Sequence, residues 1–269
     1  MTQEPKQAAT VILLNESENG LQVFMQERHR DSKGFASMLV FPGGKVDDSD
    51  RQQHWVSYCP ASEASDPEQL AHKLAVIRES YEESGVLLAR RAGGEVLAGE
   101  EVAAYSDQPQ ALQSGELDFF EFMRAEGLEP ALDLLGFFAH WITPEFEKRR
   151  FDTRFYIAEV PEAQRDELGH DGFETVDSVW ILPADAIADG KVGRRKLIFP
   201  TIRNLELLAG FNTMDEALAA GKKPGIRPIL PTVDLRDSGV YVTIPEDSGY
   251  PVCEERIPDE VVKMLSGGK

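Results

Sequence analysis

The stretch Arg78-Glu79-Ser80-Tyr81-Glu82-Glu83-Ser84-Gly85 carries the strongest signal in this 269-residue sequence. On a helix, Glu79 and Glu83 are four residues apart and Glu82 lies beside them, so three carboxylates can share one face. Such carboxylates repel one another by roughly 0.2–0.5 kcal/mol per pair, and a bound hard cation would reverse that effect. The stretch therefore predicts a divalent-cation site, with a solvated acidic helix face as the alternative.

The helix that carries this stretch has clear ends. Asp66 is a favourable N-cap, Pro67 stands at the first helical position, where its missing N–H costs nothing, and Gly85 is placed to end the helix. At about 100° per residue, its apolar residues fall within roughly 60° of one another, away from the glutamates. That apolar face is expected to pack against the core through Leu70, Leu74, Ile77 and Tyr81.

Short strands are expected on both sides of this helix in the chain. The apolar runs 8–14 and 21–26 flank an Asn-Gly turn and predict a hairpin. A third strand, 38–41, should stop at Pro42-Gly43-Gly44, because proline cannot donate to a ladder. Segment 47–65 shows no regular spacing of apolar residues and is interpreted as a loop insertion. Further strands are expected over 134–142, 152–160, 176–182 and 240–244, and further helices over 116–125, 184–188, 200–208 and 215–220.

The composition is that of a globular protein with a strongly acidic balance. Hydrophobic residues make up 42%, and 28 Lys and Arg stand against 47 Asp and Glu, a formal net charge of −19. This charge excludes a broad basic surface for nucleic acid, so a phosphate-bearing ligand must be small and locally compensated. The two cysteines exclude a disulfide framework, and neither a signal-peptide pattern nor a membrane-length apolar run is found. We therefore expect a cytoplasmic protein with no membrane or nucleic-acid partner.

The order of these residues resembles the Nudix box, G-x5-E-x7-R-E-U-x-E-E-x-G-U, in which U is a bulky apolar residue. Residues 78–85 match its second half, and Gly44 stands for its first glycine. The resemblance covers roughly 8–210. It implies an α/β (α+β) fold in which a mixed β-sheet is sandwiched between helices, with helical insertions. A single domain is expected over 1–269, with a core of about 8–210, an insertion of about 47–65 and a C-terminal extension of about 222–269.

The first half of the box departs from the pattern. Arg78 comes 34 positions after Gly44, whereas the pattern allows 14. The glutamate expected six positions after Gly44 is replaced by Asp50, and Asp47 and Asp48 are further candidates for its role. Ser80 also stands where an apolar residue is usual.

With an insertion at this point of the box, the sequence resembles the branch of the Nudix hydrolases that includes the peroxisomal coenzyme A diphosphatases. Segments 141–144, 150–155 and 180–183 are similar to that branch as well. Its coenzyme A signature reads arginine, then glycine, then Phe-Pro-Gly-Gly. Arg28 meets the first position, but Ser37 takes the place of the glycine.

The resemblance implies an Mg²⁺- or Mn²⁺-dependent diphosphatase that acts on a small nucleoside-diphosphate compound. Coenzyme A or acyl-coenzyme A, split into 3′,5′-ADP and a 4′-phosphopantetheine product, is the favoured substrate. A second possibility is ADP-ribose, a dinucleotide or another nucleotide conjugate, and a third is a nucleotide-binding module without turnover. A homodimer is possible.

Site residues follow from the same resemblance. The metal ligands would be Glu79, Glu82 and Glu83, and the catalytic carboxylates Glu82, Glu83 and Glu174. The substrate-binding residues would be Arg28, Gly43, Gly44, Arg78, Arg150 and Arg154. For Arg78, a salt bridge that orients the carboxylates is favoured over direct contact with substrate. For Arg150 and Arg154, a diphosphate clamp and a simple basic patch at a strand start stay equally open.

Overall fold

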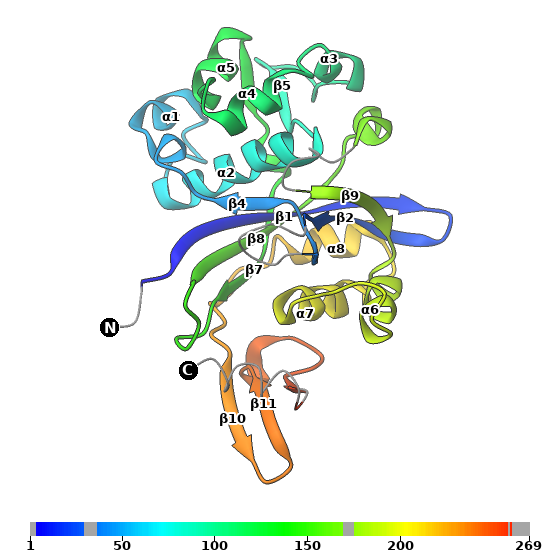
Figure 1. The fold of residues 1–269 in the computed structure, drawn as a ribbon. Helices are drawn as coiled ribbons and strands as arrows, with labels where there is room; N and C mark the ends of the chain where they lie inside the picture. Colours follow the sequence, from blue (N-terminus) through cyan, green and yellow to red (C-terminus); the bar gives the residue numbers. More distant parts are fainter. Residues whose placement is uncertain (1–3, 30–36, 169–174, 258, 260–269) are drawn as a thin grey trace.

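A mixed β-sheet lies between two layers of helices in the computed structural model, which describes residues 4–29, 37–168, 175–257 and 259 (Figure 1). The strand order is β3-β2-β1-β8-β7, with β4 paired to β1 and β9 paired to β2. Strands β1 and β8 are parallel, and the other named pairs of this sheet are antiparallel. The bounds are β1 (Lys6–Ser17), β2 (Gly20–Arg28), β3 (Leu39–Val40), β4 (Gly43–Lys45), β7 (Gly136–Ile142), β8 (Phe151–Glu159) and β9 (Thr175–Ile181). The predicted fold class is confirmed.

The fold has two hydrophobic cores, one on each face of the sheet. Strand β1 contributes to both because its side chains alternate between the two faces. Val11 and Leu13 join one buried cluster, while Ile12 and Leu14 join the other, and all four are fully buried. The predicted hairpin is present, with Ser17 opposite Gly20 at the turn.

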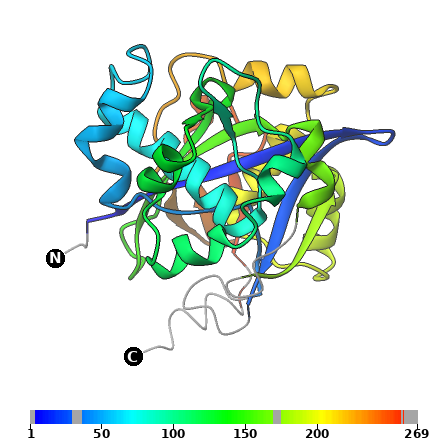
Figure 2. The same cartoon turned by 90° about the horizontal axis from the view of Figure 1, so that it is seen from above.

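Each face of the sheet is covered by its own set of helices (Figure 1). On one face lie α1 (Gln53–Tyr58), α2 (Pro67–Ser84), α3 (Gly99–Ala103), α4 (Gln108–Ser114) and α5 (Phe119–Ala125). On the other lie α6 (Pro183–Lys191), α7 (Phe199–Leu208) and α8 (Met214–Ala220). Figure 2, seen from above, shows α2 lying over the sheet. Short connecting elements are η1 (Ser49–Arg51), η2 (Leu132–Leu134), η3 (Glu162–Glu167), β5 (Ala89–Arg91) and β6 (Leu128–Pro130).

Helix α2 begins and ends where the sequence predicts. The Asp66 carboxylate accepts hydrogen bonds from the backbone N–H groups of Glu68 and Gln69, at 3.1 and 3.0 Å. At the other end Gly85 adopts φ 77°, and its N–H donates to the Tyr81 carbonyl. Its predicted apolar face is buried, each residue being at most 2% exposed: Leu70, Leu74, Ile77 and Tyr81.

The prediction of a loop over 47–65 is wrong in part, because η1 and α1 form inside this segment. Trp55 of α1 is 1% exposed, and its indole N–H donates to the Ser49 carbonyl at 3.1 Å. Its ring meets that of Phe120 edge-on, with centroids 4.9 Å apart. Six residues are too few to show a helical period, and contacts with distant α5 order the segment instead. Helix α5 itself starts at Phe119, later than predicted, because Asp118 caps it by accepting from the Glu121 N–H.

The C-terminal extension forms a small antiparallel sheet of β10 (Thr232–Arg236), β11 (Gly239–Thr243) and β12 (Glu254–Arg256), with η4 (Glu246–Ser248) between the last two. Only β11 was predicted. Tyr250 fastens the extension to the core: its hydroxyl accepts from the Trp141 indole at 3.1 Å and donates to Asn204 at 2.6 Å. Among the described residues, no helix is both long and apolar enough to cross a membrane.

A buried histidine in α2 gives the fold a measurable pH dependence. His72 is 1% exposed, and burial lowers its pKa from 6.5 to about 4. Below pH 6.5 the unfolded chain therefore binds a proton that the folded chain does not, so stability falls as the pH falls. We expect His72→Gln to lose this pH dependence. Between pH 7 and pH 5, the unfolding free energy of wild type, measured in urea, should fall by about 2 kcal/mol more than that of His72→Gln. An equal fall in the two proteins would contradict this.

Candidate active site

The C-terminal end of α2 meets Gly43 and Gly44 at the start of β4, where the chain turns into that strand (the Gly43-Gly44 turn), and Glu83 joins the helix to this turn. The Gly43 N–H donates to the Glu83 carboxylate at 2.8 Å. From the sheet, the side-chain amide of Gln26 donates to the Glu83 backbone carbonyl at 2.7 Å. Glu83 is 5% exposed, so both its backbone and its carboxylate are held in place.

Arg78 binds three carboxylates in the interior beside this turn. Its Nε and Nη2 donate to the two oxygens of Asp50 at 3.1 and 2.9 Å, a bidentate pair. Its Nη1 donates to Glu79 at 2.9 Å and lies 3.3 Å from Glu82. Glu82 is 8% exposed, and the Glu79 side chain is 13% exposed. These glutamates therefore do not form a solvated acidic face.

Of the three aspartates considered for the first half of the box, Asp50 makes the direct contact. Asp50 is 2% exposed and also accepts the Asp47 N–H at 2.9 Å. The Asp47 carboxylate lies 3.6 Å from Arg78, but its side chain is 58% exposed. Asp48 is exposed. The insertion thus brings a buried carboxylate to Arg78 although the sequence spacing of the box is lost.

Burial makes this cluster favourable for a cation. Desolvation raises the pKa of Glu79 to about 8, against the opposing effect of Arg78, and also raises the pKa of Glu82 and Asp50. A cation that neutralises these carboxylates relieves that penalty. In the described part of the chain, no three acidic, histidine or cysteine side chains are grouped so that they could hold a metal ion by themselves. Mg²⁺ does not need such a group, since it keeps several waters and shares its coordination between carboxylates and substrate phosphates. The donor set fits such an ion.

Gly44 is required by the close approach of Glu79. A Cβ atom at position 44 would lie 2.3 Å from Glu79 Oε1, far inside van der Waals contact. We therefore expect Gly44→Ala to displace the Glu79 carboxylate and to lower hydrolytic activity by at least about tenfold. Steady-state assays at saturating metal measure this. Gly210→Ala is the matched control, because a Cβ there meets nothing nearer than a backbone oxygen at 3.3 Å. Equal activity of Gly44→Ala and wild type would contradict the predicted role.

The predicted arginines do not all gather at this cluster. Arg154 pairs with Glu68, which lies about 16 Å before Glu79 along the α2 axis. Arg150 is 9% exposed, and its Nε donates to the Thr143 carbonyl at 3.0 Å. Arg154 therefore lies nearer the start of α2 than its carboxylate end. Glu174 lies outside the described residues.

Arg28 lies closer to the site, at the end of β2, two residues after Gln26. Its N–H donates to the Met38 carbonyl at 3.0 Å, and its own carbonyl accepts the Ser37 N–H at 3.1 Å. Ser37 has φ 55°, a left-handed conformation that glycine adopts far more readily. This explains why a glycine stands at that position in the coenzyme A signature.

Sequence reasoning did not find Gln26. A single amide inside the apolar run 21–26 was the available signal, since a fully buried polar side chain needs a partner. Its partner, the Glu83 carbonyl, is 57 residues away in the chain, which no local pattern reveals.

Comparison with known proteins identifies the family. Residues 59–206 match the sequence model of the NUDT19 Nudix domain, more than half of the chain. The chain belongs to the Nudix hydrolases. The predicted family, in the branch of the coenzyme A diphosphatases, is thereby confirmed. Nudix hydrolases generally use divalent metal ions.

Individual relatives of this Nudix hydrolase agree with the assignment. It is 22% identical to the acyl-coenzyme A diphosphatase NUDT19 of Xenopus laevis, over 86% of this chain and 71% of the relative. It is 25% identical to the NUDT19 protein of Gallus gallus, over 90% and 76%. A crystal structure of a Nudix hydrolase from Alicyclobacillus acidocaldarius matches 81% of this chain and 97% of that one, with 25% identity and a TM-score of 0.63.

Proposed function

We propose that this Nudix hydrolase cleaves the diphosphate of coenzyme A or acyl-coenzyme A in the presence of Mg²⁺ or Mn²⁺. The products would be 3′,5′-ADP and the corresponding 4′-phosphopantetheine. One observation supports this choice of substrate. The two positions of the coenzyme A signature, Arg28 and Ser37, are joined by a backbone hydrogen bond from the Ser37 N–H to the Arg28 carbonyl. The names of the NUDT19 relatives support the same substrate class.

Glu79, Glu82 and Glu83 would hold the divalent ion. When bound, that ion lowers the pKa of a coordinated water and neutralises charge on the diphosphate oxygens. Arg78 is assigned as a positioning residue, because its hydrogen bonds go to Asp50, Glu79 and Glu82. Asp50 would take the role of the missing glutamate of the box.

The remaining carboxylates would handle the attacking water. Glu83, held by the Gly43 N–H, or Glu82 or Glu174, would orient the water or accept its proton. Arg28 and the Gly43-Gly44 turn would contact the substrate. Arg150 and Arg154 stay predicted substrate contacts, and Arg154 would have to reach from the far end of α2.

A single domain over 1–269 is part of the proposal. Both buried clusters share strand β1, so neither could form without the sheet. The C-terminal sheet rests on the same core through Tyr250.

A substrate panel tests this function. We expect kcat/KM for coenzyme A and acetyl-coenzyme A to exceed that for ADP-ribose and diadenosine polyphosphates by at least about tenfold in Mg²⁺. A preference for ADP-ribose or a dinucleotide would replace the proposed substrate while leaving the Nudix chemistry in place. Tight binding of these compounds with no product over hours, in both Mg²⁺ and Mn²⁺, would indicate a binding module.

A further inference from the structure

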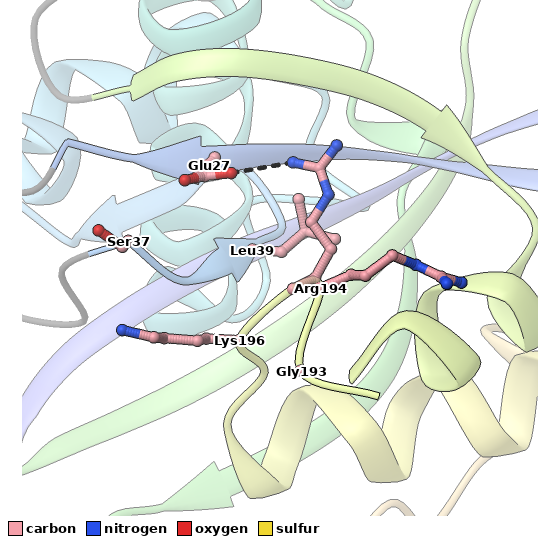
Figure 3. A pocket seen from close by; sticks show the side chains of 7 residues that line it. Glu27, Ser37, Leu39, Gly193, Arg194 and Lys196 are labelled. Carbon is pink, nitrogen blue, oxygen red and sulfur yellow. Dashed lines mark hydrogen bonds and ion pairs between the residues drawn. The ribbon is translucent and has the colours of Figure 1, made fainter. Parts of the chain in front are cut away.

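A polar pocket lies beside the sheet where the loop between α6 and α7 runs along β3 (Figure 3). Its volume is about 520 Å³, within the range of ligand sites. The loop is held to the sheet because the Leu39 N–H donates to the Lys196 carbonyl at 2.8 Å. The lining residues are Glu27, Ser37, Leu39, Gly193, Arg194, Arg195 and Lys196. None of them belongs to the carboxylate cluster around Arg78.

Three consecutive cations border this pocket in a chain of net charge −19. Arg194 is paired with Asp189, and Arg195 with Glu27 and Asp177. In the part of the chain that the structure describes, the Lys196 ammonium has no carboxylate within 4.0 Å. Among the described residues, Lys196 is therefore the one cation of the three without an acidic partner, although three cations and three carboxylates leave this cluster neutral overall.

The Arg195 guanidinium is fixed for a further contact. A single nitrogen, Nη1, donates both to Glu27 at 2.9 Å and to Asp177 at 3.3 Å. Nε and Nη2 make no hydrogen bond with any described residue, so N–H donors remain for a ligand. A guanidinium oriented by carboxylates in this way binds a phosphate oxygen at little further entropic cost.

Ser37 adds a hydroxyl at a strained position. Its left-handed φ of 55° costs roughly 1–2 kcal/mol relative to ordinary backbone. Its hydroxyl meets no hydrogen-bond partner among the described residues. Figure 3 shows Lys196 extending toward the side of the pocket where Ser37 lies, whereas Arg194 extends the other way. A strained non-glycine residue on the side of the pocket toward which Lys196 extends indicates a role for its side chain, because glycine would relieve the strain.

The pocket is near enough to the carboxylate cluster to serve the same substrate. Leu39 precedes Gly43 by four residues, which places their Cα atoms at most about 14 Å apart. Glu27 directly follows Gln26 on β2, so its side chain lies on the opposite face of the sheet from the amide that binds the Glu83 carbonyl. A nucleotide whose diphosphate lies at Glu83 would therefore place a sugar at the pocket by passing around the end of the sheet at β3.

We infer that this pocket binds a phosphate monoester on the sugar of the substrate, the ribose 3′-phosphate of coenzyme A, through Lys196, Ser37 and Arg195. The inference rests on the proposed function and deepens it, because it names the group that separates coenzyme A from nucleotide diphosphates without that phosphate. The pocket would make the enzyme selective for 3′-phosphorylated substrates.

Coenzyme A and 3′-dephospho-coenzyme A form the test pair. We expect wild type to show a KM about 10–100-fold lower for coenzyme A, the effect of hydrogen bonds to a charged group. Lys196→Met should lose most of this difference by raising KM for coenzyme A alone, with kcat little changed. Ser37→Gly should lose part of it, although glycine suits the backbone there. Equal KM values for the two substrates in wild type, or an unchanged preference in Lys196→Met, would overturn the inference.

Lys223→Met is the matched control. Lys223 is an exposed lysine that lines a separate pocket near the start of α2, and its loss changes the net charge by the same amount. It should keep the full preference for coenzyme A, which separates a local contact from the general field of the protein. If Lys223→Met and Lys196→Met lost the preference equally, the contact would be refuted.

A binding experiment keeps the two proposals distinguishable. Calorimetry with adenosine 3′,5′-bisphosphate and adenosine 5′-phosphate needs no turnover. If coenzyme A is not hydrolysed, the proposed function fails, yet tighter binding of the bisphosphate that depends on Lys196 would still support the pocket. Equal binding of both nucleotides would refute it.

Discussion

Glu83→Gln is expected to lower kcat for coenzyme A by about 10²–10⁴-fold, the range supplied by a positioned catalytic carboxylate. The substitution keeps the size of the side chain, and the amide oxygen can still accept the Gly43 N–H. What it removes is the negative charge that would bind the cation or take the proton of water. Glu83 is 5% exposed and is held by two hydrogen bonds, so the substitution changes the charge of a buried group that is fixed in position.

Initial rates at saturating coenzyme A and Mg²⁺ measure this change, with an unfolding curve to show that the variant is folded. Glu100→Gln is the control, because Glu100 is an exposed glutamate of α3 and its loss changes the net charge equally. Wild-type turnover by folded Glu83→Gln would remove Glu83 from the catalytic site.

Arg78→Met is expected to destabilise the fold by about 3–5 kcal/mol, because it leaves buried carboxylates without their counter-ion. Arg78 is 6% exposed and contacts Asp50, Glu79 and Glu82, which would then lose the cation that offsets their desolvation in the interior. Urea unfolding in metal-free buffer measures the effect. Arg236→Met is the comparison: Arg236 also pairs with two acids, but at the surface, and should change stability by less than about 1 kcal/mol.

A double-mutant cycle assigns part of this effect to Asp50. Asp50→Asn removes one of the buried charges, so adding it to Arg78→Met should cost much less than the sum of the single changes. Strict additivity would mean that the bidentate pair contributes nothing to the cluster.

The sequence was most informative where the signal is local. The ends of α2 follow from Asp66, Pro67 and Gly85, whose cap geometry needs no distant partner. The Asn-Gly hairpin and the carboxylate face of α2 follow from short spacings in the same way. The family assignment rests on that same stretch, because the order of the box residues is far more specific than three glutamates alone.

Features that depend on distant contacts could not be predicted. Helix α1 is ordered by the aromatic residues of α5, more than 60 residues later in the chain. Asp50 was one of three possible aspartates until the fold showed which carboxylate is buried against Arg78. The sequence left a diphosphate clamp and a simple basic patch equally open for Arg154, and only the packing shows that Glu68 holds it near the other end of α2.

The masses of the products show whether this site splits the diphosphate of coenzyme A. Wild type incubated with coenzyme A and Mg²⁺ should yield 3′,5′-ADP and 4′-phosphopantetheine in equal amounts, with neither formed in EDTA and both formed at least about a hundredfold more slowly by Glu83→Gln. Intact coenzyme A under conditions in which ADP-ribose or a dinucleotide is cleaved would show that coenzyme A is not the substrate.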